Sequence, residues 1–385
     1  MKYLSQNIPK DKRVLLRTDY NVPIAQGTIT DTTRIKDSLP TLELLLKNNN
    51  RVIILTHLGR PKGIETALSL EPVRVALQTL LLEKKVILVK NLDDVDAFAN
   101  QTPSEIILVE NIRFFPGEEA NDPAFAKKLA ALGDVFVNDA FSFCHRSTAS
   151  MIGLTEYLPS YCGLALEKEL NFLTKLSKNP KRPFVAITGG GKISTKLTLL
   201  ASLAVKADKV LVGGGIANNL LKASGNEIGG SIAEPSLLPE AEKLLKQHAD
   251  KFLLPQDVVV LKPDHSVVYV DVDRIEPEDR IEDIGEKTRE SFRAEILNAG
   301  TVVWNGPVGE FEKEEFSKGT HAVLQAISES NAVSIVGGGD TLAAIAKYPK
   351  LAAKISFIST GGGALLEYIE NGTLPGIDAL EKNIS

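Results

Sequence analysis

The stretch IVGGGDTLAAI, residues 335–345, carries the pattern from which the fold can be inferred. A hydrophobic run ends at Val336, three glycines follow, and a run with helical spacing starts at Asp340. Glycines between a strand and a helix expose backbone N–H groups to an anion, because a helix N-terminus is electropositive. A carboxylate at this place is therefore unexpected. One interpretation is that Asp340 is the helix N-cap.

Similar strand-like runs alternate with helical patterns along the whole chain. Segments 38–49 and 123–132 have apolar residues at helical spacing. Near-continuous apolar strands that alternate with helices predict parallel sheets covered on both faces, an α/β fold whose ligands bind beyond the carboxyl ends of the strands. The predicted strands are residues 14–17, 52–55, 86–89, 106–109, 135–138, 184–188, 210–212, 258–261, 301–304, 333–336 and 355–359.

A boundary between two domains is predicted near residues 165–183. The segment 165–177 reads as a helix with Leu166, Leu170, Leu173 and Leu176 on one side, and the prolines of NPKRP then end it. The chain length of 385 residues also favours two domains. We expect domains at 1–164 and 184–371, with 165–183 as the inter-domain helix and linker.

Composition restricts the class of protein. No apolar run reaches the ~18 residues of a membrane span, and the N-terminus lacks the apolar core of a signal peptide. Two cysteines, Cys144 and Cys162, favour packed thiols in a reducing cytosol over a disulfide framework. A net charge of -5 argues against a nucleic-acid coat. We therefore expect a cytoplasmic protein without nucleic-acid or membrane partners.

The second half of the chain has four three-glycine turns, each after a predicted strand, at 189–191, 213–215, 337–339 and 361–363. They suggest a surface where backbone approaches a ligand, although tight strand-to-helix packing could explain one or two. None completes the P-loop or dinucleotide fingerprint. Lys192 and Lys196 follow the first turn and, at spacing i, i+4, would share a helix face and reach phosphates; a solvated pair is the alternative.

The first half places basic residues after its strands. Arg17 and Asp19 follow the first, and His57 and Arg60 follow the second. Later strand ends and one loop add Arg113, His145, Arg146 and Arg34. Arginine binds carboxylate and phosphate through two parallel hydrogen bonds. This half is therefore predicted to bind a small anion of several charges.

A basic pocket in one half and a glycine-lined pocket in the other indicate phosphoryl transfer between two ligands. Nucleotide phosphates carry Mg²⁺, which proteins hold through one or two carboxylates. Asp340 would then bind the metal, not a phosphate. A packed role remains open for Cys144, and a strand-end capping role for His57.

With these motifs in place, the chain resembles the phosphoglycerate kinase family nearly from end to end. The matching stretches, in family order, are KRVLLRTDYNVP, THLGRP, LVENIRF, DVFVNDAF, HRSTAS, TGGGKISTK, VGGGIAN, WNGPVGEFE, VGGGDTLAAI and STGGGALLE. The resemblance implies two Rossmann-like domains joined by a hinge helix, with the C-terminal tail, about 372–385, packed on the first domain. It implies reversible transfer of the acyl phosphate of 1,3-bisphosphoglycerate to Mg-ADP, giving 3-phosphoglycerate and ATP in glycolysis.

The resemblance also implies the site residues. The triose site would contain Asp19, Tyr20, Asn21, Arg34, His57, Leu58, Gly59, Arg60, Arg113 and Arg146. The nucleotide site would contain Lys196, Gly213, Gly214, Pro307, Gly309, Glu312, Gly338, Gly339, Asp340 and Thr341, with Glu312 at the ribose hydroxyls. Arg34 and Lys196 would flank the transferring group, Lys192 would support phosphate charge, and Asp340 would hold Mg²⁺.

Several positions depart from the commonest family pattern, namely Thr148, Thr195, Asn218, Asn219 and Glu310. Most lie near the expected nucleotide pocket and bear on base preference.

Two other classes of protein are considered: a nicotinamide-dependent dehydrogenase, which the missing fingerprint disfavours, and a periplasmic-type binding protein, which the missing export signal disfavours. The family resemblance favours a monomer.

Overall fold

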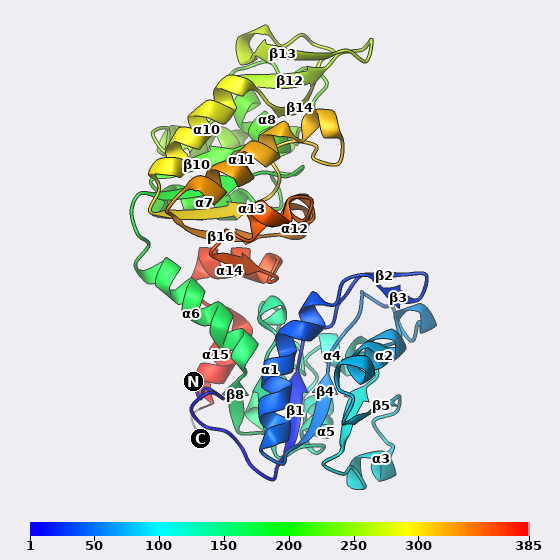
Figure 1. The fold of residues 1–385 in the computed structure, drawn as a ribbon. Coiled ribbons are helices and arrows are strands. Elements are labelled where there is room, and N and C mark those ends of the chain that lie inside the picture. The colour runs from blue at the N-terminus through cyan, green and yellow to red at the C-terminus, as the bar shows by residue number, and fades with distance from the viewer. Residues whose placement is uncertain (384–385) are drawn as a thin grey trace. The chain divides into compact units, whose positions relative to one another are not determined.

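The computed structural model describes residues 1–383, apart from the side chains of 176–178, and divides into two compact units (Figure 1). Unit 1 is Met1–Phe172 together with the C-terminal segment from Thr373, and unit 2 is Leu173–Gly372. The division falls inside the segment predicted as the hinge. The side chain of Leu176, and residues 384–385 of the predicted tail, lie outside the described residues.

Unit 1 is built on a six-stranded sheet in which every pair of neighbours is parallel. The strand order places β1 between β4 and β7, so the chain reverses its direction of progress across the sheet at β1. This is the topological switch point where ligands bind in open α/β sheets. In sheet order the strands are β5 (Lys85–Val89), β6 (Glu105–Val109), β4 (Arg51–Leu55), β1 (Arg13–Arg17), β7 (Val135–Asn138) and β8 (Ser160–Cys162).

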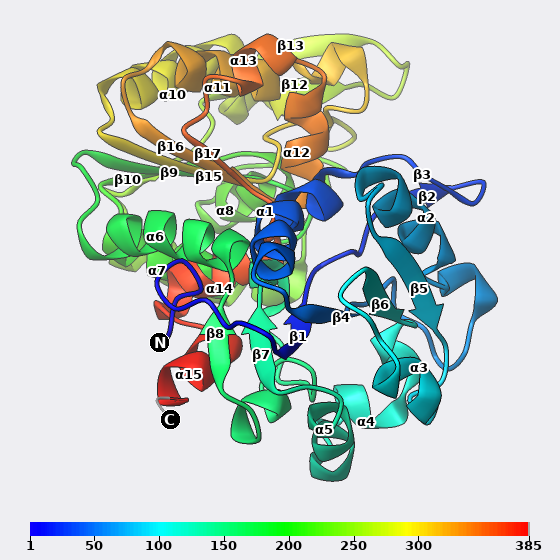
Figure 2. The ribbon, with the colours of Figure 1, turned by 60° about the horizontal axis from the view of Figure 1, so that its bottom comes forward.

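Helices cover this sheet because their apolar side chains match its buried faces. Helix α1 packs against the sheet through Ile35, Leu42 and Leu45, which are fully buried (Figures 1 and 2). It starts five residues before the predicted segment and contains Pro40. The helices of unit 1 are α1 (Thr33–Lys47), α2 (Glu71–Leu80), α3 (Val95–Ala99), α4 (Pro116–Glu119), α5 (Pro123–Ala130) and α15 (Pro375–Lys382), and β2 (Ile24–Ala25) pairs with β3 (Thr28–Ile29).

Unit 2 repeats the design with a second six-stranded parallel sheet. Its order places β9 next to β15, and the chain extends to opposite sides from this pair, which again creates a switch point. In sheet order the strands are β11 (Phe252–Leu253), β10 (Lys209–Val212), β9 (Phe184–Thr188), β15 (Thr301–Asn305), β16 (Val333–Gly337) and β17 (Phe357–Ser359), of which β9, β10, β15, β16 and β17 are labelled in Figure 2. The helices are α7 (Leu197–Lys206), α8 (Gly214–Ala223), α9 (Leu238–Gln247), α10 (Glu286–Asn298), α11 (Lys318–Glu329), α12 (Gly339–Ala346), α13 (Pro349–Ala352) and α14 (Gly363–Asn371).

The two parallel sheets confirm the predicted α/β class, with one strand misplaced. Residues 258–261 form part of β12 (Asp257–Leu261), which pairs antiparallel with β13 (Val267–Asp271) and β14 (Arg280–Ile284) in a separate three-stranded sheet. Val258, Val259 and Val260 are fully buried, so their apolar run has the same sequence pattern as a central strand of a parallel sheet. Periodicity does not distinguish the two environments.

Helix α6 (Leu164–Lys178) begins in unit 1 and ends in unit 2, because the division lies between Phe172 and Leu173. Its N-terminus is held by Asp139, whose Oδ1 accepts hydrogen bonds from the backbone N–H groups of Ala165 (2.8 Å) and Leu166 (3.3 Å). Burial raises the pKa of Asp139 to about 7, although these backbone hydrogen bonds oppose the shift. A carboxyl from the end of β7 thus anchors the helix that the sequence predicts to be the hinge.

Asp139 should make the stability of unit 1 depend on pH. A group whose pKa is raised by folding contributes stability that is present below its unfolded value and is lost as pH rises through the folded value. Relative to Asp139→Asn, the native protein should therefore lose up to about 4 kcal/mol between about pH 4 and about pH 7. Unfolding midpoints across this range measure it, with Asp122→Asn, an exposed cap of α5, as control. A parallel pH dependence of native and Asp139→Asn would contradict the prediction.

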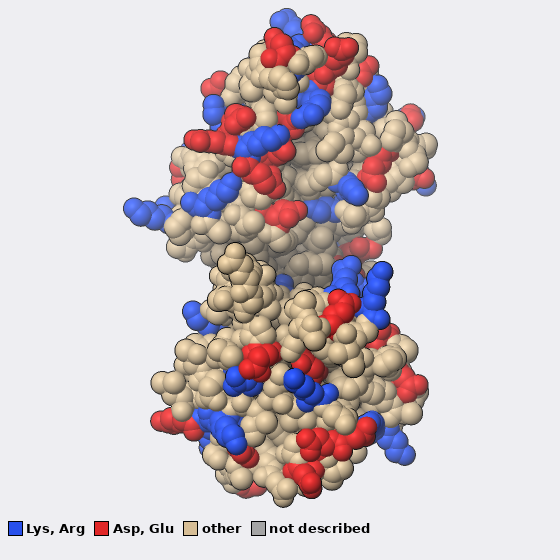
Figure 3. Space-filling model, turned by 90° about the vertical axis from the view of Figure 1, so that its right-hand side faces the viewer, with Lys and Arg blue, Asp and Glu red and all other residues tan. Residues whose placement is uncertain are grey.

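The last described residues pack on unit 1. The Asn383 side chain donates to the carbonyl of Leu158 (3.0 Å) and accepts from the Ser160 N–H (3.0 Å), while the Gly376 N–H donates to the carbonyl of Cys144 (2.8 Å). On the face shown in Figure 3, Lys and Arg are interspersed with Asp and Glu, without a large field of one sign. Within residues 1–383, no helix has both the length and the apolar composition needed to cross a membrane.

Candidate active site

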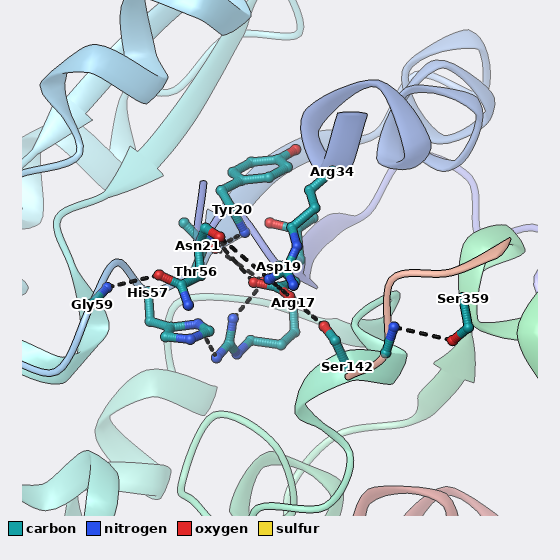
Figure 4. Close-up of polar contacts among 12 residues, drawn as sticks. Arg17, Asp19, Tyr20, Asn21, Arg34, Thr56, His57, Gly59, Ser142 and Ser359 are labelled. Atoms are coloured by element: carbon teal, nitrogen blue, oxygen red, sulfur yellow. Dashed lines mark hydrogen bonds and ion pairs between the residues drawn. The ribbon is translucent and has the colours of Figure 1, made fainter. Parts of the chain in front are cut away.

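Polar side chains gather at the carboxyl ends of β1, β4, β6 and β7 in unit 1, and Figure 4 shows their contacts. Asp19 is at the centre. Its Oδ2 accepts from the Arg34 guanidinium (2.5 Å) and from the Ser142 hydroxyl, and its Oδ1 accepts from the Asn21 N–H (3.0 Å). Burial alone would raise the pKa of Asp19, but the Arg34 charge and the hydrogen bonds from Ser142 and Asn21 hold it below its usual value. An ionised Asp19 therefore positions Arg34.

The loop after β4 is shaped by Gly59, whose φ of +63° favours glycine, and a Cβ there would lie 2.8 Å from a methyl of Leu68. The Gly59 N–H donates to Asn21 Oδ1 (2.9 Å), and its carbonyl accepts from Arg113 (2.6 Å). The preceding Leu58 is buried, and its backbone exchanges hydrogen bonds with the Asn111 side chain. The structure thus brings together five of the predicted triose residues through backbone and side-chain contacts.

Two predicted arginines are placed differently. Arg60 and Arg146 are exposed and, within residues 1–383, form no ion pair, so their charge is available to an anion. Tyr20, which was also predicted for the triose site, has a fully buried ring, and its hydroxyl bonds Ser38 (2.7 Å). Burial raises its pKa to about 12. Any ligand contact by Tyr20 must therefore come from its backbone.

In unit 2, two adjoining pockets open at the β9–β15 switch point. One encloses about 510 Å³ and is lined by Gly214, Pro307, Gly309, Glu310 and Glu312, among others. The second encloses about 360 Å³ and is lined by Lys192, Lys196, Gly338, Gly339, Asp340 and Thr341, among others. Both volumes are in the range of small-molecule sites. Asp340 and the glycine turn at 190–191 line both pockets, so one ligand could occupy the two.

The structure corrects the expected lysine pair. Lys192 and Lys196 both precede α7, which begins at Leu197, so they share no helix face. Lys196 is held by the carbonyls of Gly189 (2.7 Å) and Asn305 (3.2 Å), and burial lowers its pKa to about 8. Asp340 opposes this shift. Lys192 is exposed at the pocket wall.

The question raised by Asp340 has a structural answer. The N-cap of α12 is Gly338, no side chain caps the helix, and Asp340 lies in its first turn, so the capping interpretation is wrong. Asp340 is exposed and faces both pockets. Among residues 1–383, no group of three or more His, Cys, Asp or Glu could hold a metal. A single exposed carboxylate fits an ion whose other ligands are phosphate oxygens and water.

The glycine turns serve both packing and the pockets. Gly213, predicted for the nucleotide site, is not among the lining residues of either pocket, and a Cβ there would lie 2.4 Å from that of Val308. Gly338 has a φ of +100°, and the neighbouring Thr341 is buried with its hydroxyl accepting from the Gly306 N–H (2.7 Å). The 338–341 turn therefore positions the start of the 306–312 loop. This contact joins two motifs that are separate in the sequence, so neither motif alone predicts it.

The positions that depart from the family pattern are spread over several environments. Glu310 and Asn218 line the 510 Å³ pocket, and Thr195 lines the other. Asn219 is structural, since its side chain bonds the Gly215 carbonyl and the Glu234 N–H (both 2.9 Å). Thr148 is buried in unit 1, as is Cys144, whose pKa burial raises to about 12; this confirms a packed thiol.

Several residues of these sites were not named among the predicted site residues. Thr56 and Ser142 follow strands, Asn305 ends β15, and each of the three holds a site backbone or side chain. Gly362 and Gly363, from the fourth glycine turn, line the 360 Å³ pocket. Their position after strands was an available signal. No sequence signal pointed to Glu118 and Ser150, because they are linked to the site through Arg17: Ser150 bonds Arg17, and Glu118 bonds Ser150.

The fold has two parallel sheets covered by helices. One switch point carries an arginine-rich cluster, and the other carries a glycine-lined pocket with a lysine and a carboxylate. These features define a phosphotransferase of the nucleotide-dependent class. Comparisons with known proteins identify which one. The sequence profile of the family described as Phosphoglycerate kinase matches residues 5–372. The chain belongs to the phosphoglycerate kinase family.

Named relatives agree over nearly full length. Phosphoglycerate kinases of Dictyoglomus turgidum and Moorella thermoacetica are each 46% identical to this chain; they cover 97% and 96% of it and align over 96% of their own lengths. Among solved structures, the phosphoglycerate kinase from Coxiella burnetii matches with a TM-score of 0.90 and 41% identity over 100% of this chain and 99% of its own. That from Pyrococcus horikoshii matches with a TM-score of 0.86, 30% identity and the same coverage.

The chain is therefore a kinase of glycolysis that reversibly transfers the acyl phosphate of 1,3-bisphosphoglycerate to ADP, giving 3-phosphoglycerate and ATP. The family uses magnesium-nucleotide substrates. The dehydrogenase and binding-protein alternatives are thereby wrong.

Proposed function

We propose that the unit 1 cluster binds the triose substrate and that the two adjoining pockets of unit 2 bind the magnesium nucleotide. The observation that carries the assignment is that Lys196 and Asp340 line the same 360 Å³ pocket at the β9–β15 switch point. A cation and a carboxylate on one glycine-lined wall suit a phosphate chain and its metal. The larger pocket, which Glu312 lines, would take the nucleoside.

In unit 1, each cation has a distinct role. Arg60 and Arg146 supply exposed charge for the phosphate of the triose, while Arg113, held by the Gly59 carbonyl, borders the loop that carries His57. Asp19 holds Arg34 in place, since Arg34 NH1 donates to the Asp19 carboxylate and to the Asn21 carbonyl (3.3 Å). Rotation about its side chain would carry the guanidinium from Asp19 to the transferring phosphoryl group.

In unit 2, Lys196 is the group that stabilises developing charge. Its two carbonyl partners position the ammonium, and the nearby Asp340 favours its protonated form. Lys192, exposed on the wall of the same pocket, supports phosphate charge. Magnesium, when bound at Asp340, supplies charge neutralisation on the nucleotide phosphates. The backbone of Gly338 and Gly339 and the Thr341 N–H border these phosphates.

The reaction needs positioning and charge stabilisation more than proton transfer. The attacking and leaving oxygens belong to a carboxylate and a diphosphate, which are already acidic, so no general base is required. His57 acts as a hydrogen-bond donor to the substrate in this scheme. Arg34 and Lys196 would flank the transferring group from the two units.

A coupled assay of ATP formation from 1,3-bisphosphoglycerate and ADP tests this assignment. The native protein should turn over with a magnesium requirement, and Lys196→Met should lose most of kcat. The control Lys209→Met removes a lysine at the start of β10, whose ammonium bonds the Asp250 carbonyl instead. Equal losses in both variants, or none in either, would overturn the role of Lys196.

Closure between the units is the proposed motion. Triose residues precede position 150 and nucleotide residues follow 190, whereas in-line transfer needs reacting atoms about 3–3.5 Å apart. We expect the 165–183 segment to be the pivot. Either ligand alone should favour closure weakly, and both together strongly. Small-angle scattering should give a smaller radius of gyration with 3-phosphoglycerate plus a magnesium-nucleotide analogue than with either; an apo protein already as compact would contradict this.

The protein is further proposed to act in the cytoplasm as a monomer, with small molecules as its only partners. The mixture of charges on the face shown in Figure 3 and the family's small substrates support this. Size-exclusion chromatography with light scattering at working concentration would measure the mass.

A further inference from the structure

Arg17, the last residue of β1, is fully buried although it carries a charge. Its Nε donates to Ser150 Oγ (3.0 Å), one NH1 hydrogen goes to the Thr18 carbonyl, and NH2 lies 3.4 Å from His57 Nδ1 (Figure 4). The centre of the guanidinium stands 4.4 Å from the ring centroid of Phe143. A buried cation needs such partners to offset its desolvation. Because it has no exposed surface, Arg17 acts through its neighbours and not on substrate.

The hydrogen bonds of this cluster have defined directions. Glu118 is fully buried; its carboxylate accepts the Ser150 hydroxyl (2.6 Å) and the Ser150 N–H (2.9 Å). The hydroxyl proton is thereby committed to Glu118, and a lone pair of Ser150 Oγ is left to accept from Arg17. Three residues from α4, the loop after β7 and β1 form one chain.

The same logic assigns the proton on His57. A guanidinium has five donors and no acceptor, so His57 Nδ1 can only accept from Arg17. In a neutral imidazole the other nitrogen, Nε2, then carries the hydrogen. Burial lowers the pKa of His57 well below its usual value, and Arg17, Arg113 and Arg34 add to this while Asp19 opposes it. The ring is therefore neutral at physiological pH.

We propose that the buried chain Glu118–Ser150–Arg17 fixes His57 in the Nε2–H tautomer and makes it a preset hydrogen-bond donor to an anionic oxygen of the substrate. Arg17, Ser150 and Glu118 are positioning residues. Phe143 contributes by packing on both partners, since its centroid lies 4.5 Å from that of His57. The tautomer itself follows from these contacts; only the identity of the acceptor, the triose, rests on the proposed function.

Preset donors matter in an anion site. A histidine that exchanged tautomers would present a lone pair to the substrate oxygen part of the time, and two acceptors repel. Fixing the donor in the apo protein removes that reorganisation from the binding step. The Glu118–Ser150–Arg17 chain therefore allows the neutral His57 to donate a hydrogen bond to the anion without adding positive charge to the arginine cluster.

Nitrogen-15 NMR of the full-length apo protein tests the tautomer directly. The chain has five histidines, so His57 can be assigned by its loss in His57→Gln. The native spectrum should show Nδ1 as the unprotonated and Nε2 as the protonated nitrogen, with a single tautomer. A protonated Nδ1 in the native protein would overturn the proposal without any variant.

Variants test the chain behind Arg17. Ser150→Ala and Glu118→Gln should each introduce a measurable share of the Nδ1–H tautomer and raise KM for 3-phosphoglycerate roughly tenfold, with a smaller effect on kcat. Ser160→Ala is the matched control, because Ser160 is equally buried in unit 1 and its hydroxyl bonds the nearby Leu158 carbonyl (2.8 Å). The same KM change in the control, or an unchanged tautomer in both chain variants, would overturn the proposal. A correct tautomer in a protein without kinase activity would instead refute the proposed function.

Discussion

Replacing Arg34 by alanine is expected to lower kcat by roughly 10³-fold or more, by analogy with arginines that stabilise a transferring phosphoryl group. KM for 3-phosphoglycerate should rise less, because the cations of Arg60, Arg113 and Arg146 remain. Steady-state kinetics in both directions of the reaction measure the two constants. Normal kcat with only a raised KM would reassign Arg34 to uniform substrate binding.

The contact between Arg34 and Asp19 makes a further control necessary for this variant. Arg34→Ala also leaves Asp19 without its guanidinium partner, with a side chain only 10% exposed. Part of any loss could come from this stranded carboxylate. The double variant Arg34→Ala/Asp19→Asn removes both charges, and a double-mutant cycle separates the two causes. Arg74→Ala removes an arginine of α2 that pairs with Glu71, and so reports the effect of removing an arginine outside the site.

Replacing Asp340 by asparagine is expected to raise the magnesium concentration for half-maximal activity and to lower kcat/KM for the nucleotide by roughly 100-fold at fixed magnesium. The melting temperature should change little. Asp340 is exposed and caps nothing, so only its favourable place in the first turn of α12, about 0.3–1 kcal/mol, is lost. Full activity with an unchanged magnesium requirement would remove Asp340 from the metal site.

Two measurements make the test specific. Glu240→Gln removes an exposed carboxylate from the first turn of α9 in the same unit and therefore reports the helix-dipole contribution alone. Calorimetry of Mg-ADP binding measures affinity independently of turnover. Since Asp340 raises the pKa of Lys196, which burial lowers to about 8, Asp340→Asn should also shift the basic limb of the pH–rate profile to lower pH. The shift would be absent if the two side chains did not interact.

The position of a site residue can be inferred from the sequence most directly where the residue and its chemistry lie in one motif. THLGRP and VGGGDTL place His57 and Asp340 after strands, so the parallel-sheet rule alone carries them to a ligand edge. The direction of a side chain is harder to infer. Tyr20 is in the DYN motif but points into the core, and Gly213 is in a glycine turn but packs on Val308. A motif specifies position along the chain, not the direction of a side chain.

The local sequence by itself determined most strands of the two parallel sheets, the glycine turns and the α/β class, because hydrophobic periodicity and glycine both act over a few residues. Tertiary structure decided what depends on distant partners. It showed that Asp340 does not cap α12, that Lys192 and Lys196 precede α7, and that 258–261 joins an antiparallel sheet. Only the tertiary structure showed the hydrogen-bonded chain of Glu118, Ser150, Arg17 and His57. Within it, Arg17 and Ser150 are 133 residues apart in the sequence. Burial and hydrogen bonding across such separations fix charge states and tautomers, and no local pattern encodes them.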